Sequence, residues 1–249
     1  MSNVQSIQDA FVNLYESKQY VTDKTGVKTI ELVGASFVCD KPAIFGEPNY
    51  EYINREFEWY LSQSLDVNDI PGNVPQIWQD ISDKDGMINS NYGYLIYSTE
   101  NFEQYRKVKD ELKKNPNSRR AVMIYTRPTM HEEYNVNGMS DFICTNAVQY
   151  LIRDNKLHAV VQMRSNDVVF GYRNDYAWQN QVLHDLARDL NIDCGDITWQ
   201  VGSLHVYERH FKFIEDEIQK RKDAKETLKL ADMAMGNYYG EVSKFYEQN

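Results

Sequence analysis

Apolar residues recur along the chain with both helical and strand-like spacing, in an irregular order. Near the N-terminus, Ile7, Phe11, Leu14 and Tyr15 follow helical spacing and predict an amphipathic helix. The next apolar segment, residues 29–40, is rich in β-branched and aromatic side chains. That composition predicts a strand.

Helical and strand-like segments continue to mix further along the chain. Residues 68–96 are interrupted by Gly and Asn and predict loops with short elements. Helical periodicity predicts helices over 49–65, 101–114, 175–192 and parts of 208–249. Apolar runs predict strands over 121–127, 141–152, 156–165 and 196–207. Because no regular βαβ rhythm is present, the pattern predicts an α+β (mixed α/β) fold rather than a doubly wound one.

Composition and charge narrow the classes of function. The chain has 249 residues, of which 42% are hydrophobic and 26% charged, as in a soluble globular protein. We expect a single domain over residues 1–249, because no repeat or linker is visible. The net charge of −10 argues against direct binding to nucleic acid or to an anionic membrane. The polar N-terminus and the lack of a long apolar run predict a cytoplasmic protein.

The cysteines raise the first question of chemistry. Cys39, Cys144 and Cys194 form an odd set without CxxC spacing, so neither a disulfide framework nor a metal site is expected. Cys144 lies within a predicted strand, where the ordinary interpretation is a buried, inert thiol. Three polar segments elsewhere in the chain favour a functional thiol instead.

The densest of these segments follows the strand predicted over 156–165. It contains six closely spaced polar residues: Arg164, Ser165, Asn166, Asp167, Asn174 and Asp175. Polar density directly after an apolar strand indicates a binding site, although a solvated loop has the same composition.

The other two segments suggest an anion and a sugar. Arg119 and Arg120 precede a predicted strand, where they are either an anion clamp or a plain surface pair. His205 and Tyr207 share one face of a strand. They are placed either to hydrogen-bond a sugar hydroxyl or to serve as polar core residues.

Several motifs in one order resemble the thymidylate synthase family. RSNDVVFG followed by GSLHVYERH is similar to its R-S-x-D-x-x-x-G and G-x-x-H-x-Y-x-x-H signature. REFEWYL, IWQD, NYGY, SRRAVM and DKTGVKT resemble further family segments, so the resemblance runs from about residue 23 to 210. Within the family, DKTGVKTIELVGASFV, MSDFICTNAVQYLIRD and MRSNDVVFGYRNDYAWQ are most similar to the phage deoxycytidylate hydroxymethylases.

The resemblance implies a fold and an assembly. The fold would be a large, mostly antiparallel or mixed sheet flanked by helices. Two copies would form a homodimer that packs sheet to sheet. Arg119 and Arg120 would reach across the interface to the neighbouring subunit's phosphate. A phage nucleotide-synthesis complex is a further partner that the resemblance suggests.

The resemblance also implies a role for each site residue. Cys144 would be the nucleophile, Glu56 would organise water and move protons, and Asp175 would contact the base. The residues implied to bind the nucleotide are Lys24, Arg119, Arg120, Arg164, Ser165, Asn166, Asn174, His205 and Tyr207. Those implied to lie beside the folate are Trp78, Tyr92 and Asp167.

The implied reaction is one-carbon transfer from 5,10-methylenetetrahydrofolate to C5 of dCMP with addition of water, giving 5-hydroxymethyl-dCMP and tetrahydrofolate. Asp175 stands where synthases have an asparagine that reads uracil, which favours dCMP over dUMP. In the alternative interpretation, Asp175 caps a helix beginning at Tyr176 and Asn174 reads the base. Thr145 and Lys24 depart from the synthase histidine and arginine, and residues 240–249 do not resemble the apolar tail that closes over folate.

Other functions stay open at this point. The same fold also suits thymidylate synthesis or hydroxymethylation of dUMP. A hydrolase would combine Cys144 with His205 or His131. A non-catalytic scaffold in a phage nucleotide-synthesis complex would use the charged helices at 102–114 and 208–230.

Overall fold

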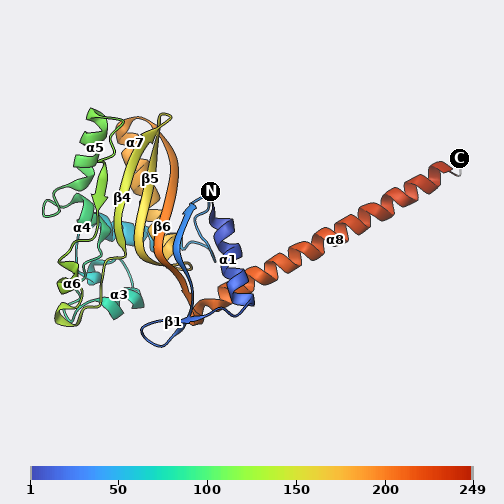
Figure 1. The fold of residues 1–249 in the computed structure, drawn as a ribbon, viewed down its shortest axis with the longest axis horizontal. Helices are drawn as coiled ribbons and strands as arrows, with labels where there is room; N and C mark the ends of the chain where they lie inside the picture. The colour runs from blue at the N-terminus through green and yellow to red at the C-terminus, as the bar shows by residue number, and fades with distance from the viewer. Residues whose placement is uncertain (1, 248–249) are drawn as a thin grey trace.

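A six-stranded sheet forms the centre of the molecule (Figure 1). The computed structural model describes residues 2–247, and side chains as far as residue 231. The strands are β1 (Val21–Thr22), β2 (Lys28–Val38), β3 (Val122–Ile124), β4 (Thr145–Arg153), β5 (Lys156–Asp167) and β6 (Asp193–Tyr207). Their order is β1-β2-β6-β5-β4-β3, with β5 and β6 parallel and every other pair antiparallel. The prediction of a mixed sheet in an α+β fold is confirmed.

Helices at the predicted places flank this sheet. The α-helices are α1 (Val4–Glu16), α2 (Tyr50–Ser62), α3 (Gln76–Ile81), α4 (Tyr92–Tyr97), α5 (Gln104–Lys114), α6 (Met130–Glu133), α7 (Gly171–Leu190) and α8 (Phe211–Glu247). Single 3₁₀ turns are η1 (Val67–Asp69), η2 (Val136–Gly138) and η3 (Glu208–His210). The predicted loop region 68–96 contains only the short helices α3 and α4 and the end of η1.

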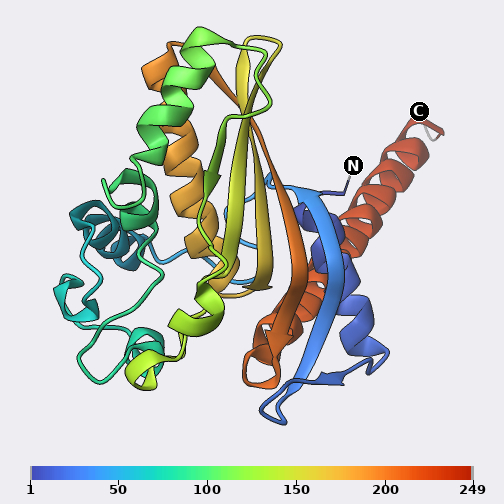
Figure 2. The ribbon, with the colours of Figure 1, turned by 60° about the vertical axis from the view of Figure 1, so that its left-hand side comes forward.

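Helix α7 is held firmly against one face of the sheet. Leu157 and Val161 of β5 are fully buried, as are Val182 and Leu186 of α7, which packs against β5. Each such side chain contributes about 1.5–3 kcal/mol by leaving water. Figure 2 shows α5 and α7 together on this side of the sheet. The first turns of α7 are thereby fixed over the ends of β5 and β6.

The opposite face of the sheet carries exposed side chains. Val33 of β2 is 82% exposed, and Gln162 of β5 and Gln200 of β6 are also exposed. The exposed Val33 side chain gives this face an apolar surface that a partner could cover.

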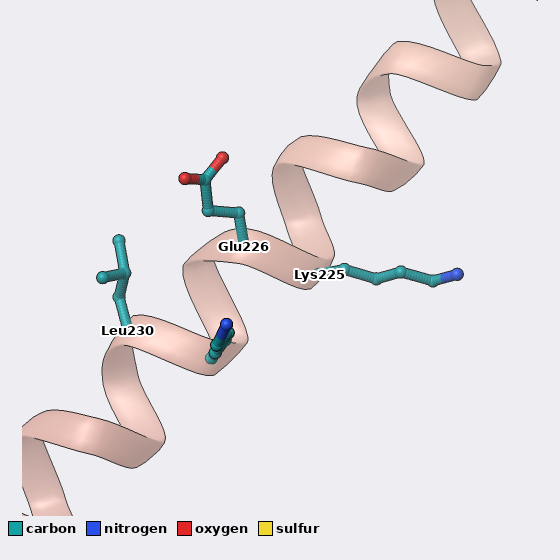
Figure 3. A pocket seen from close by; sticks show the side chains of 4 residues that line it. Lys225, Glu226 and Leu230 are labelled. Carbon is teal, nitrogen blue, oxygen red and sulfur yellow. The ribbon is translucent and has the colours of Figure 1, made fainter.

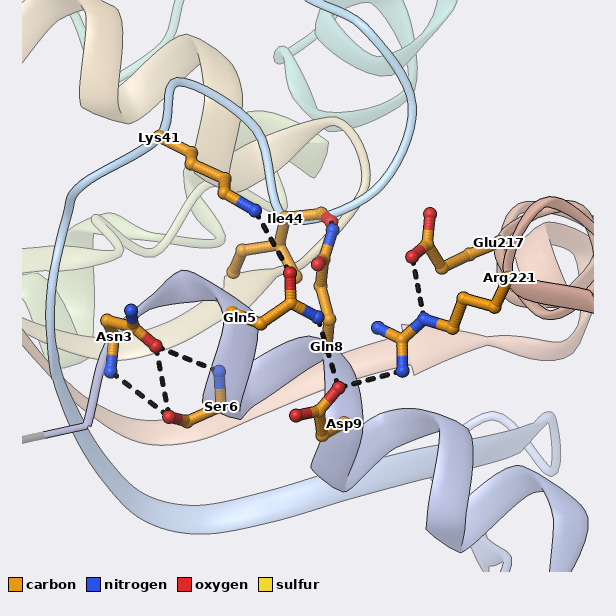
Figure 4. Close-up of polar contacts among 9 residues, drawn as sticks. All are labelled: Asn3, Gln5, Ser6, Gln8, Asp9, Lys41, Ile44, Glu217 and Arg221. Carbon is orange, nitrogen blue, oxygen red and sulfur yellow. Dashed lines mark hydrogen bonds and ion pairs between the residues drawn. The ribbon is translucent and has the colours of Figure 1, made fainter. Parts of the chain in front are cut away.

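Helix α8 begins against α1 and then projects away from the body (Figure 1). Arg221 joins the two helices, because it pairs with Asp9 at 2.7 Å and with Glu217 at 2.8 Å (Figure 4). The helical prediction for 208–249 is confirmed as far as Glu247, with a single long helix after η3. The side chains of the tail 240–249 lie outside the described part. Within that part, no helix is long and apolar enough to cross a membrane.

Candidate active site

Arg164 positions Cys144 directly before the first residue of β4. The backbone N–H of Arg164 donates to the carbonyl of Cys144 at 2.9 Å, and its Nε donates to the carbonyl of Ile143 at 3.0 Å. Its Nη2 lies 3.6 Å from the Cys144 sulfur. Cys144 is half-buried and precedes β4 by one residue, so its placement within a strand was wrong by one position. The thiol is therefore partly buried beside a cation.

The thiol is not ionised by this setting alone. Burial raises the pKa of Cys144 to about 11, although the Arg164 guanidinium opposes the shift. The charges of Asp175 and Asp141 act in the same direction as burial. A thiol of this kind needs a proton acceptor or a bound reactant before it becomes a strong nucleophile.

Asp175 lies in the second turn of α7 and is fixed by an amide. Asn166 Nδ2 donates to its Oδ2 at 2.7 Å, while Trp199 Nε1 donates to Asn166 Oδ1 at 3.2 Å. The indole thus determines which end of the amide faces the carboxyl. A Cβ at Gly171 would come within 3.0 Å of Asn166 Nδ2, so a glycine there keeps this contact undisturbed.

The environment of Asp175 disfavours its charge. Burial and the charge of Glu56 raise the pKa of Asp175 to about 8, although Asn166 and Tyr92 oppose the shift. The carboxyl is mostly protonated at neutral pH and can donate as well as accept.

Asp167 closes the turn that leads into α7, and Asp175 does not cap the helix. Asp167 Oδ1 accepts from the backbone N–H groups of Val169 at 2.9 Å and Phe170 at 2.7 Å, and more weakly from Gly171 at 3.4 Å. The interpretation of Asp175 as the cap of a helix beginning at Tyr176 was wrong, because α7 begins at Gly171.

The pKa of Asp167 moves in the opposite direction to that of Asp175. Burial acts to raise it, but His210 and the N–H of Phe170 hold it below its usual range.

Glu56 is a buried carboxyl on α2 with one clear partner. Tyr52 donates its hydroxyl proton to Glu56 Oε1 at 2.5 Å, and Trp78 Nε1 donates to the Tyr52 oxygen at 2.9 Å. Burial raises the pKa of Glu56 to about 7, although Tyr52 and Trp78 oppose the shift. Near neutral pH this group exists in both protonation states, which suits proton transfer.

Tyr92 and Thr145 form a buried hydrogen-bonded pair near Asp175 and Cys144. Thr145 Oγ1 donates to the Tyr92 hydroxyl at 2.9 Å. Burial and the charges of Asp175 and Cys144 raise the pKa of Tyr92 well above its usual value. The sequence noted Thr145 only as a departure from the family pattern, so its contact with Tyr92 was missed. Hydrogen bonds between segments 53 positions apart leave no local signal.

The residues predicted to meet the sugar and phosphate lie where β5 and β6 end. Ser165 is paired with Ser203, and Asp167 with His205, across the parallel strands. The rings of His205 and Tyr207 are 4.9 Å apart and perpendicular.

The turn that carries Lys24 lies close to Tyr207, because the charge of the neighbouring Asp23 acts on the Tyr207 hydroxyl. Burial raises the pKa of Tyr207, and the charges of Asp23, Asp167 and Cys144 act in the same direction. Lys24 itself is exposed, in a turn that Asp23 closes by accepting from the backbone N–H of Thr25 at 2.8 Å.

Two of the residues predicted to bind phosphate stand apart from this group. Arg119 and Arg120 are exposed, and Arg120 pairs with Glu111 at 3.2 Å. Within residues 2–231, no hydrogen bond or ion pair joins either arginine to Cys144. Asn174 is half-buried on α7, and its Oδ1 is buried without a hydrogen-bond partner among the described residues.

The hydrolase alternative gains no support from the geometry. The His131 ring packs against Phe142 at 5.4 Å, and His205 Nδ1 lies 3.3 Å from the carbonyl of Ser203. In the described part of the chain, neither imidazole hydrogen-bonds to the sulfur of Cys144.

The described residues outside this group include a surface hollow but no metal-binding cluster. The residues described contain no cluster of three His, Cys, Asp or Glu side chains that would hold a metal ion. A shallow hollow on the projecting part of α8 is lined by Lys225, Glu226, Lys229 and Leu230, which Figure 3 shows on a helix with nothing packed beside it. The chemistry is thus concentrated around Cys144.

Comparisons with known proteins identify the family of this chain. The family model described as thymidylate synthase matches residues 6–245. The deoxycytidylate 5-hydroxymethyltransferases of Enterobacteria phages T4 and T2 are each 60% identical over 207 residues, 80% of this chain and 84% of theirs. The solved thymidylate synthase of phage T4 has a similar fold, with a TM-score of 0.68 at 24% identity over 83% of this chain and 77% of that one. The chain therefore belongs to the thymidylate synthase family.

Proposed function

We propose that this protein transfers a one-carbon unit from 5,10-methylenetetrahydrofolate to C5 of dCMP and adds water, giving 5-hydroxymethyl-dCMP and tetrahydrofolate. The observation that carries the proposal is Asp175, a carboxyl with a pKa of about 8 that Asn166 fixes in the site of Cys144. The phage relatives at 60% identity, whose names state deoxycytidylate 5-hydroxymethylation, support it.

The neutral carboxyl of Asp175 complements cytosine. It accepts from the N4 amino group through one oxygen and donates its proton to N3 through the other. Uracil presents an acceptor at O4 and a donor at N3, so it meets the carboxyl less well. Because unpaired polar groups in a buried site are costly, this difference selects dCMP.

Asp175 and Cys144 then act together on the ring. The sulfur of Cys144 forms a bond to C6, and the electrons of the C5–C6 double bond move through the ring toward N3, which takes the proton of Asp175. The resulting enamine makes C5 nucleophilic, so one difficult step becomes two easier ones. Arg164 stabilises the thiolate 3.6 Å away.

Glu56 serves the later proton transfers. C5 bonds to the methylene carbon, its proton passes to the departing nitrogen of the folate, and tetrahydrofolate leaves. Glu56 takes a proton from water as the oxygen adds to the exocyclic methylene, and the electrons return through the ring to expel Cys144. N3 then returns its proton to Asp175, and the proton on Glu56 goes to the departing sulfur. Its pKa of about 7 allows Glu56 to accept and to return protons near neutral pH.

The remaining residues bind the two reactants. We assign the phosphate to Arg164, Ser165 and Lys24, and the deoxyribose to His205 and Tyr207. Trp78 and Asp167 would face the folate. Asn166 hydrogen-bonds Asp175, so we place it next to the base. We also place Tyr92 there instead of beside the folate, because its hydroxyl acts on the pKa of Asp175.

The active form would be a homodimer of single-domain subunits of residues 1–249. The exposed face with Val33, Gln162 and Gln200 is the surface that a second copy would cover. Arg119 and Arg120, which are exposed away from Cys144, would then reach the partner's phosphate. Mixing inactive Cys144→Ala and Arg120→Ala proteins should restore part of the activity; proven subunit exchange without restoration would contradict this arrangement.

The deciding experiment supplies methylenetetrahydrofolate with dCMP or with dUMP. We expect 5-hydroxymethyl-dCMP from dCMP without dihydrofolate, and loss of turnover in Cys144→Ala. Dihydrofolate produced from dUMP would show a thymidylate synthase instead. Unchanged biological function in Cys144→Ala would indicate a scaffold.

A further inference from the structure

Two buried atoms face each other where β5 ends and α8 begins. Asp167 Oδ2 and His210 Nδ1 lie 3.8 Å apart, and neither has a hydrogen-bond partner among the described residues. Asp167 uses its other oxygen, Oδ1, for the backbone N–H groups of Val169 and Phe170 in the turn before α7. That turn is thus closed without Oδ2, which remains available for another task.

Aromatic packing sets the position of His210. Its ring meets Phe170 at 4.9 Å, edge to face, and Phe213 at 6.4 Å, while Phe170 and Phe213 are 5.7 Å apart. Arg173 covers the other side of this group, with its guanidinium 4.5 Å from the Phe170 ring. The imidazole is therefore held with Nδ1 directed at Asp167, although nothing in the packing of the rings requires a nitrogen there.

We propose that His210 is a positioning residue for Asp167. Its Nδ1–H is directed at Oδ2 and fixes the rotation of the carboxylate, so that Asp167 presents one orientation to the reactant. The inference rests on the proposed function in one respect, because it takes the reactant beside Asp167 to be the folate. A buried polar pair that is nearly in contact costs little to close once a ligand excludes water.

Two variants separate this role from simple packing. His210→Phe keeps the ring between Phe170 and Phe213 but removes the nitrogen. His210→Asn loses the ring but keeps an N–H donor near the place of Nδ1. His184→Phe, at an exposed position on α7, is the matched control for the exchange of an imidazole for a phenyl ring.

We expect His210→Phe to raise the KM for methylenetetrahydrofolate roughly tenfold, the usual effect of losing a hydrogen bond to a charged group. The KM for the nucleotide and kcat at saturating folate should change less than about threefold. His210→Asn should recover most of the folate KM, and His184→Phe should match the parent enzyme. Thermal melting confirms that each variant is folded.

Three results would overturn the role of His210. The first is an unchanged KM for folate in His210→Phe, and the second is an equal rise of that KM in His210→Asn. The third is a rise of similar size in the KM for the nucleotide in His210→Phe. If dUMP proves to be the substrate, the proposed function fails, but the same folate comparison is run with dUMP. If no turnover occurs with either nucleotide, the affinity for tetrahydrofolate is measured by quenching of protein fluorescence. The dissociation constants of the parent and the variants are then compared in place of KM.

Discussion

Asp167 and Asp175 belong to the same short segment but occupy opposite environments. Asp167 sits at the N-terminus of α7, where backbone N–H groups and His210 favour its charge and lower its pKa despite burial. Asp175 lies in the second turn, where burial and the neighbouring Glu56 raise its pKa to about 8. Eight residues along the chain separate a carboxylate from a carboxylic acid.

The two pKa values differ because the two carboxyl groups have different numbers of hydrogen-bond donors near them. A helix N-terminus offers several unpaired N–H groups and a favourable dipole. The second turn offers none, because its N–H groups are already bonded within the helix. Asp175 receives only the Asn166 amide as a well-formed partner, and this does not compensate for lost water. The fold thus makes a structural anion and a proton donor from one residue type.

The largest test of the comparison replaces Asp175 by Asn. We expect turnover of dCMP to fall roughly 100-fold or more, because an amide cannot give a proton to N3. Turnover of dUMP should rise at the same time, since the amide pairs with its O4 and N3–H. Comparison of kcat/KM for the two nucleotides measures the change.

Asn174→Ala is the control for this exchange, because Asn174 is the other candidate to read the base. It should leave the preference for dCMP within a few-fold of the parent value. A preference that moves with Asn174 and not with Asp175 would contradict the assignment.

The sequence predicted most of the fold but not the opposite protonation states of Asp167 and Asp175. Regular apolar spacing marked α1, α7 and the long strands, because their periodic burial is local. The motif order pointed to Cys144 and Arg164 before their contact was known. The start of α7 was misread, because the helix begins at Gly171, directly after a turn that Asp167 closes, and not at Tyr176. The pairing of Thr145 with Tyr92 depends on distant segments and has no sequence signature.

A second test compares stability, where the two aspartates should have opposite signs. The pKa of Asp175 in the folded state lies above the unfolded value of about 4. The stability linked to this group is therefore complete below pH 4 and is lost as the pH rises toward 8. Asp175→Asn should raise the free energy of unfolding at pH 8 by on the order of 1 kcal/mol after solvent screening, and leave it unchanged at pH 4.

Asp167→Asn should do the reverse. Its lowered pKa contributes stability above about pH 4 that is lost as the pH falls through the folded value. We expect a loss of about 1 kcal/mol at pH 8, because the charge at the helix N-terminus is removed. Melting curves of both variants at pH 4 and 8 test the pair, and a shift of the same sign at pH 8 would refute the comparison.

A third test concerns Glu56, whose pKa is raised by burial like that of Asp175. Tyr52→Phe removes the donor that opposes the shift, so the pKa of Glu56 should rise further above 7. The acidic limb of the pH–rate profile, which needs an ionised Glu56, should move to higher pH by about one unit. Tyr50→Phe, exposed on the same helix, should leave the profile unchanged. An unmoved limb in Tyr52→Phe would mean that another group controls it.

The smallest expected effect concerns the indole behind Asn166. Trp199→Phe keeps the aromatic packing but removes the donor to Asn166 Oδ1, so the amide is free to turn its oxygen toward Asp175. The preference for dCMP over dUMP should fall several-fold, as expected for one neutral hydrogen bond of about 1 kcal/mol. Trp178→Phe is the matched control, because within residues 2–231 its Nε1 has no acceptor. Equal losses of preference in the two variants would show that bulk in the core, and not the orientation of Asn166, governs how Asp175 meets the base.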